Sequence, residues 1–155
     1  MTHIARLLCL VLLLAAPLAR AGERPQMAEY GKAYRGPELL YVYVAHTKED
    51  GHAVIKISGI NHPLDNHTFW AKVTYSNGQF GKTRVSYSVE SAKEEERPGL
   101  FIENSSNSSA TLYLPNYRGQ ARVEIPLFYD EYESRETRPE HLLTEYNEQQ
   151  SGGRN

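Results

Sequence analysis

Apolar and polar residues alternate along several short stretches of the chain. The pattern is clearest in residues 68–75, where every second residue is apolar, and it returns in residues 82–89 and 120–128. Alternation over four to eight residues is typical of a β-strand with one buried face. Seven strands are predicted in this way, over residues 39–46, 53–60, 68–75, 82–89, 100–103, 110–114 and 120–128.

The number and spacing of these segments predict the fold class. Short strands separated by turns, each with one apolar face, are typical of antiparallel all-β domains. We therefore expect an antiparallel β-sandwich of about seven strands with an immunoglobulin-like arrangement, and a small barrel is the alternative. Pro126 lies inside the last strand and predicts an edge position or a bulge there, because proline cannot donate a backbone hydrogen bond.

The chain outside these strands is divided by its composition. Residues 1–21 are predicted as a signal peptide, 22–37 as a flexible N-terminal arm, 38–134 as the β-domain and 135–155 as a short C-terminal helix or a disordered acidic tail. In the tail, Thr137 and Glu140 have the spacing of a capping box. A narrow apolar stripe of Leu142, Leu143 and Tyr146 follows and predicts about three helical turns.

The first 21 residues have the three parts of a secretory signal peptide. Arg6 precedes an apolar run from Leu7 to Leu14, and an Ala-x-Ala sequence ends at Ala21. The apolar run is shorter than the roughly 20 residues that span a bilayer. We predict cleavage near Ala21 and a periplasmic or secreted protein, and the alternative is a buried N-terminal helix.

Charge and cysteine content narrow the classes of function. Cys9 is the only cysteine and lies in the signal peptide, so the exported chain has no disulfide, thiolate ligand or cysteine nucleophile. Removal of residues 1–21 takes away Arg6 and Arg20 and leaves a net charge of −4. This balance is not that of a nucleic-acid-binding protein, and no later segment is apolar enough to span a membrane.

The loop His62–His67 is a candidate metal site. His62, Asp65 and His67 carry side chains that bind zinc or copper, and His46 or His52 are candidates for a further ligand. The alternative is a solvated connection between strands, in which these polar residues bond to their own backbone.

Trp70 is a candidate anchor for a carbohydrate or another small ligand. It lies opposite the predicted core face of its strand, among lysine and arginine residues of the sheet. A tryptophan on a sheet surface offers apolar area and a polar N–H group, which suits a sugar ring. The alternative is that Trp70 covers an edge of the sheet.

The run from Phe128 to Glu133 combines aromatic and acidic side chains. Its candidate binding residues are Phe128, Tyr129, Asp130, Glu131 and Tyr132. Such a surface suits a basic protein partner, since charge steers encounter and aromatic side chains anchor the complex. The alternative is an ordinary solvated end of the last strand.

No Gly-x-Ser-x-Gly sequence, glycine-rich phosphate loop or strong metal motif occurs in the chain. We therefore expect no cofactor and no enzymatic activity. The sequence favours an exported binding protein, foremost a protein-interaction module such as a periplasmic inhibitor, an immunity protein or an envelope accessory factor. A glycan- or small-ligand-binding protein and a metal-binding protein or metal-dependent enzyme at residues 62–67 are the alternatives.

Overall fold

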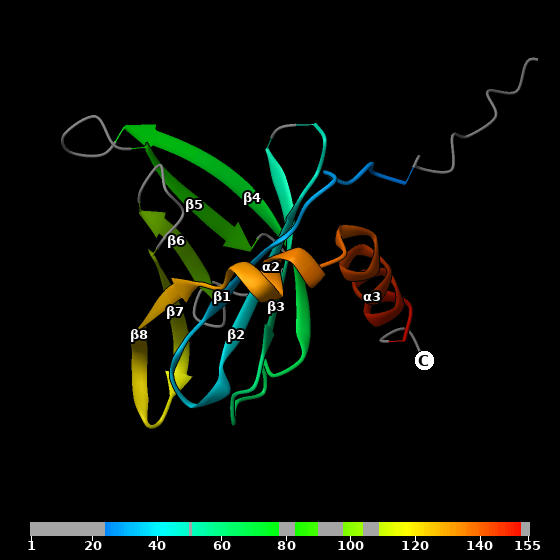
Figure 1. Cartoon of the computed structure of the whole chain (residues 1–155). Helices are drawn as coiled ribbons and strands as arrows, with labels where there is room; N and C mark the ends of the chain where they lie inside the picture. Colours follow the sequence, from blue (N-terminus) through cyan, green and yellow to red (C-terminus); the bar gives the residue numbers. More distant parts are fainter. Residues whose placement is uncertain (1–23, 50, 78–82, 90–97, 104–108, 153–155) are drawn as a thin grey trace, which may run out of the picture.

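A computed structural model describes residues 24–49, 51–77, 83–89, 98–103 and 109–152. Its strands follow one another around a closed antiparallel barrel in the order of the sequence, and β1 returns to pair with β8 (Figure 1). The strands are β1 (Lys32–Arg35), β2 (Tyr41–His46), β3 (His52–Ser58), β4 (His67–Asn77), β5 (Thr83–Val89), β6 (Gly99–Glu103), β7 (Ser109–Tyr117) and β8 (Gln120–Tyr129). A 3-10 turn, η2 (Pro37–Leu39), connects β1 to β2, and helices α2 (Glu131–Glu136) and α3 (Pro139–Gly152) follow β8.

The all-β prediction is confirmed, but the protein is a barrel and the expected sandwich is not found. Alternation reports that one face of each strand is buried, and this condition is the same in a sandwich and in a barrel. Closure depends on β1, which pairs with β2 along its whole length and with β8 only through Tyr34–Tyr129 and Arg35–Phe128. The seven predicted strands correspond to β2–β8.

The predicted flexible arm, residues 22–37, is wrong for most of its described length. It contains β1 and, before it, a segment that bonds to the β2–β3 hairpin through Ala28 N–H to His46 O (2.8 Å) and Lys48 N–H to Gln26 O (2.8 Å). Four residues are too few to show alternation, and the polar residues around Tyr34 gave no strand signal. Residues 1–23, with the predicted signal peptide, lie outside the described residues.

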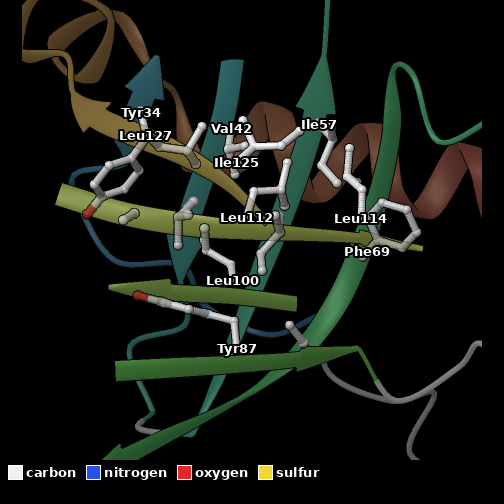
Figure 2. Close-up of a cluster of buried hydrophobic side chains, with 14 of the residues drawn as sticks. Tyr34, Val42, Ile57, Phe69, Tyr87, Leu100, Leu112, Leu114, Ile125 and Leu127 are labelled. Carbon is white, nitrogen blue, oxygen red and sulfur yellow. The ribbon is translucent and has the colours of Figure 1, made fainter. Parts of the chain in front are cut away.

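The barrel interior is filled with apolar side chains that meet in rows across neighbouring strands. The pairing register places Val73, Tyr87, Leu100, Leu112 and Ile125 side by side on β4 to β8. Figure 2 shows these rows meeting side chains from the opposite wall, such as Val42 and Ile57. Each fully buried side chain of this size contributes about 1.5–3 kcal/mol, so the interior supplies most of the apolar burial.

A second apolar cluster lies outside the barrel, where α3 packs on β2, β3 and β4. It consists of Met27, Ala45, Val54, Leu142 and Leu143, with Tyr43, Trp70 and Tyr146 packed against it. The predicted helix in the tail is thus confirmed. Within the described chain, no helix combines the length and apolar character that crossing a membrane requires.

The helix ends differ from the predicted capping box. Thr137 ends α2, and its hydroxyl donates to the carbonyl of Glu133 (2.7 Å) instead of capping α3. Asp130 is the N-cap of α2 and accepts a hydrogen bond from Glu133 N–H (3.0 Å). Because α2 bends the chain back over β1, Ser134 accepts a hydrogen bond from Ala33 N–H (2.8 Å).

Candidate functional site

The wall of the barrel has a short gap at the end where the β7–β8 hairpin turns. β8 pairs with β1 only through Phe128 and Tyr129. Among the described residues, 120–127 of β8 have no strand partner on the edge that faces β1. The β1–β2 connection, with η2, lies there instead of a strand. Pro126 lies in this part of β8, where the strand pairs with β7 alone, although β8 as a whole pairs with both β7 and β1.

A hollow of about 480 Å³ lies between this part of β8 and η2, and we call it the barrel-end hollow. Its apolar wall is formed by the buried residues Leu40, Ile60, Tyr117 and Ile125 and by the partly buried Val123. Its polar rim is formed by Glu38, Asn61, Arg118, Gln120 and Glu124. Small-molecule sites are commonly concave, of about 300–1,000 Å³, with apolar walls and a few polar groups, and the mouth of a barrel is a common place for one. The barrel-end hollow has this size, and polar and apolar groups line it in similar amounts.

An ion pair crosses the rim of the barrel-end hollow. The guanidinium of Arg118, in the β7–β8 turn, bonds to the carboxylate of Glu38 in η2 and lies 5.2 Å from the ring centre of Tyr117. The pKa of Arg118 is raised, first by the carboxylate of Glu38 and then by Tyr117. Both charged groups are exposed to solvent, so the pair fixes the distance between the two segments more than it stabilises the fold.

The backbone is strained at this end of the barrel. All described non-glycine residues with positive φ lie at this end, four in the connections and Asn116 next to the end of β7: Glu38, Leu39, Asn66, Asn116 and Arg118. Each left-handed residue costs about 1–2 kcal/mol, although asparagine tolerates this conformation better than the others. Strain of this kind is concentrated at binding and catalytic sites.

Leu39 is one of the residues with strained backbone in the β1–β2 connection. Its φ is 66° and its side chain is 76% exposed, beside the barrel-end hollow. The backbone of Gly59 passes close to Leu39, since a Cβ atom at Gly59 would lie 2.1 Å from the Leu39 carbonyl oxygen. The connection therefore holds an apolar side chain in water at the cost of strained backbone.

The opposite end of the barrel interior carries buried polar groups. The Tyr87 hydroxyl and His46 Nε2 form a hydrogen bond of 2.9 Å, whereas the Tyr34 hydroxyl is buried and has no hydrogen-bond partner in the described chain. Figure 2 shows the two hydroxyl groups at the same end of the interior. Burial is the main cause that raises the pKa of both tyrosines far above the usual value, so both phenols stay neutral.

Two of the predicted metal ligands, His62 and Asp65, form hydrogen bonds within the chain, and His67 Nδ1 lies 3.2 Å from Asp65 O. His62 donates through Nε2 to Pro115 O (2.9 Å) and accepts through Nδ1 from Leu64 N–H (3.1 Å), so no ring lone pair is left for a metal. Asp65 accepts from the N–H groups of Gly59 (2.8 Å) and Ile60 (3.2 Å). The part of the chain described here contains no group of three histidine, cysteine or acidic residues that could hold a metal ion.

Trp70 lies beneath α3, on the outer face of β4. The ring of His52 stacks on it at 5.4 Å between centroids, and Tyr146 of α3 packs on it at 5.9 Å. Trp70 also borders a hollow of about 630 Å³ with His52 and residues 24–26. Trp70 is thus partly buried and takes part in the contact between helix and sheet, and it also borders this hollow.

The five predicted binding residues of the acidic run make different contacts. Asp130 caps α2, Glu131 pairs with Arg135, and the ring of Tyr129 lies edge-on to Tyr34 at 5.8 Å. Phe128 and Tyr132 are 64% and 73% exposed, and Tyr129 is 37% exposed. Phe128 and Tyr132 are therefore the most exposed aromatic side chains of this run.

Sequence reasoning missed the barrel-end hollow. Three distant segments form it, residues 37–40, 59–61 and 117–126, and no local pattern links them. The turn Asn116-Tyr-Arg-Gly119 was the available signal, since asparagine and glycine there supply the positive φ of a tight turn. Comparisons with protein-family models, with curated proteins and with solved structures find no match to this chain.

Proposed function

We propose that the protein binds a small molecule and that the barrel-end hollow is its binding site. The observation that carries this proposal is the combination of an apolar wall with a polar rim in a hollow of about 480 Å³. An eight-stranded barrel is wide enough for its own side chains or one small ligand. Here the side chains fill the interior, so a ligand binds at the mouth.

The lining residues define the class of ligand. Leu40, Ile60 and Ile125 favour an apolar body, and the ring of Tyr117 suits a planar group. The rim donors and acceptors, Asn61 and Gln120, favour a few uncharged polar substituents at its outer end. No covalent chemistry is proposed, and the protein acts by binding alone.

Titration with the uncharged dye Nile red, whose fluorescence rises in apolar surroundings, tests this proposal. Val123→Trp fills the hollow from its wall, and we expect at least a tenfold loss of affinity. Ala121→Trp is the matched control, because Ala121 is exposed on the same strand outside the hollow. Equal affinity in both variants, with unchanged far-UV circular dichroism, would refute the site. Asn61→Trp at the rim provides a second block that leaves the interior untouched.

A second candidate function is capture of a protein partner, as the sequence predicts. Phe128 and Tyr132 support it, because large aromatic side chains on exposed surfaces commonly anchor interfaces. A pull-down from the native source with Phe128→Ser and Tyr132→Ser tests it. Loss of a specific partner in both variants supports this function, and capture equal to that of the unmutated protein rejects it.

We also propose that the protein is exported. The support comes from residues 1–21 of the sequence alone. N-terminal sequencing of protein from the native source tests it, with Gly22 expected as the first residue. Protein that retains Met1 inside the cell would reject this proposal.

A further inference from the structure

The edge of β8 that faces β1 carries backbone groups without a strand partner. Next to the short β1–β8 pairing, Asp130 N–H donates to Ala33 O (2.9 Å). In an antiparallel pair, the N–H and C=O groups of every second residue point to the same side. The register of β8 with β7 has no bulge from residue 120 to 128, so this alternation continues along the strand. Arg122 and Glu124 therefore direct their N–H and C=O groups to the β1 side, where no described strand pairs with them.

The barrel-end hollow runs along this edge. Four consecutive residues of β8, 123–126, line it, and residues of η2 line its other side. Ile125 is buried in the core, whereas Glu124 and Pro126 are exposed on the outer face. Because the hollow touches residues of both faces, it lies beside the backbone of β8 and not only beneath the inner face. Its volume, about 480 Å³, is within the range of sites for small ligands, so it has room for a short extended chain.

Arg122 and Glu124 give this edge a pattern of charge. Both side chains are exposed, and Val123 lies between them and lines the hollow. The Arg122 guanidinium lies 4.7 Å from the ring centre of Tyr113 on β7. Side chains directly opposite each other on paired strands interact, and opposite charges attract. An antiparallel chain that places a basic residue opposite Glu124, an apolar one opposite Val123 and an acidic one opposite Arg122 therefore matches the edge.

We propose that the ligand of the barrel-end hollow is a short peptide of the order basic–apolar–acidic, which adds to the free edge of β8 as an antiparallel strand. Its apolar side chain enters the hollow beside Val123 and Leu40, and its backbone pairs with Arg122 and Glu124. In this mode of recognition, main-chain hydrogen bonds supply affinity and alternate side chains supply specificity. The inference rests on the proposed function, since it names the class of ligand for the same hollow.

The probe is the peptide acetyl-Val-Lys-Val-Glu amide, and its matched control, acetyl-Val-Glu-Val-Lys amide, has the two charges exchanged. We expect the control to bind about three- to tenfold more weakly, because both cross-strand charge pairs become repulsive. N-methylation of the lysine amide, which points to β8, should weaken the probe by about fivefold or more, since it removes one hydrogen bond and blocks the pairing. Binding is measured by ¹H–¹⁵N NMR. In the complex, hydrogen exchange of the Arg122 and Glu124 amides should slow, whereas that of the Val123 amide, which faces β7, should stay unchanged.

Exchange of the two charges in the protein, by Arg122→Glu together with Glu124→Arg, should reverse the preference between the peptides. If this variant does not fold, the peptide comparison and the hydrogen exchange of the unmutated protein decide. The proposal is overturned if no peptide binds, if the control binds as tightly as the probe or more tightly, or if the Arg122 and Glu124 amides are unaffected.

Failure of this inference is distinguishable from failure of the proposed function. Nile red binding that is lost in Val123→Trp, without any peptide binding, leaves the hollow as a small-molecule site and rejects the peptide. Nile red binding that is the same in Val123→Trp and Ala121→Trp rejects the hollow itself, and this inference with it.

Discussion

Leu143→Ala tests whether α3 is part of the folded domain or a helix that docks independently. Leu143 is 1% exposed and packs in the outer cluster with Met27, Ala45 and Val54. The substitution removes three carbon atoms, worth about 0.8 kcal/mol each, and the remaining cavity adds to this cost. We expect a loss of about 3 kcal/mol, within the range of about 2–5 kcal/mol for buried leucines.

Urea unfolding measures this loss with two signals. Trp70 is the only tryptophan and lies against Tyr146 of α3, so its fluorescence reports on the helix contact. Far-UV circular dichroism reports mainly on the barrel. With a slope of about 2 kcal/mol per molar urea, the midpoint should fall by about 1.5 M in both signals together. The matched control is Glu148→Ala, an exposed position on the same helix, which should leave the midpoint within about 0.3 M.

Two outcomes would refute the reasoning. An unchanged midpoint would mean that Leu143 is not buried in the native state. A fluorescence transition that precedes the circular dichroism transition would mean that α3 leaves the barrel before the barrel unfolds, and the protein would not be two-state. In the second case, the outer cluster would not stabilise the barrel.

Three further substitutions test other parts of the fold by the same urea assay. Gly59→Ala should lower the free energy of unfolding by about 2–5 kcal/mol, because φ is +80° and the added Cβ meets Leu39 O. Gly119→Ala is the control, with a similar φ and open space around it, and should lower the free energy of unfolding by about 1–2 kcal/mol. Equal losses in the two variants would contradict the contact between Gly59 and Leu39. Gln149→Ala should lower the free energy of unfolding by about 1–3 kcal/mol, since the Gln149 side chain makes three hydrogen bonds to the buried Thr68. Gln150→Ala, at an exposed position, is the control and should cost less than about 0.5 kcal/mol. An equally small loss in Gln149→Ala would argue against the three hydrogen bonds. Above pH 10, stability should fall by about 1.4 kcal/mol per pH unit for each buried tyrosine, because a raised folded-state pKa keeps the phenol protonated while the unfolded chain ionises. The stability that the buried phenol contributes is complete below the pKa of tyrosine in the unfolded chain and is lost as the pH rises above it. Tyr87→Phe should therefore make the fall of stability with pH shallower. An unchanged slope of stability against pH would mean that Tyr87 ionises freely in the folded protein.

The sequence predicts the strands well because each strand has one buried face. The range 68–75 lies within β4, and 120–128 covers all but the last residue of β8. The closure of the sheet was not predictable, since it depends on two residue pairs between β1 and β8 that are far apart along the chain. A four-residue strand shows no periodicity, so the segment was taken for a flexible arm.

The candidate sites were predicted less well, and the reasons are physical. Residue type identifies side chains that can bind metal, but it does not show that His62 and Asp65 already bond to their own loop. In the same way, the residue type of Trp70 does not show that Tyr146 of α3 packs against its ring. Asp130 and Glu133 carried a local signal, an N-cap spacing, which would have revealed α2.

The proposed barrel-end site follows from how the barrel is closed. The rows of interior side chains and the outer cluster supply apolar burial, and this surplus permits strained backbone at one end and an unpaired phenol at the other. The barrel-end hollow lies at the joint where β1 leaves β8, so a molecule bound there contacts both η2 and β8. Such a ligand binds only the closed barrel, and it therefore adds stability by mass action, about 2.7 kcal/mol at one hundred times its dissociation constant. On this proposal binding is coupled to closure of the barrel, because the ligand would contact both η2 and β8 where β1 forms no strand pairs.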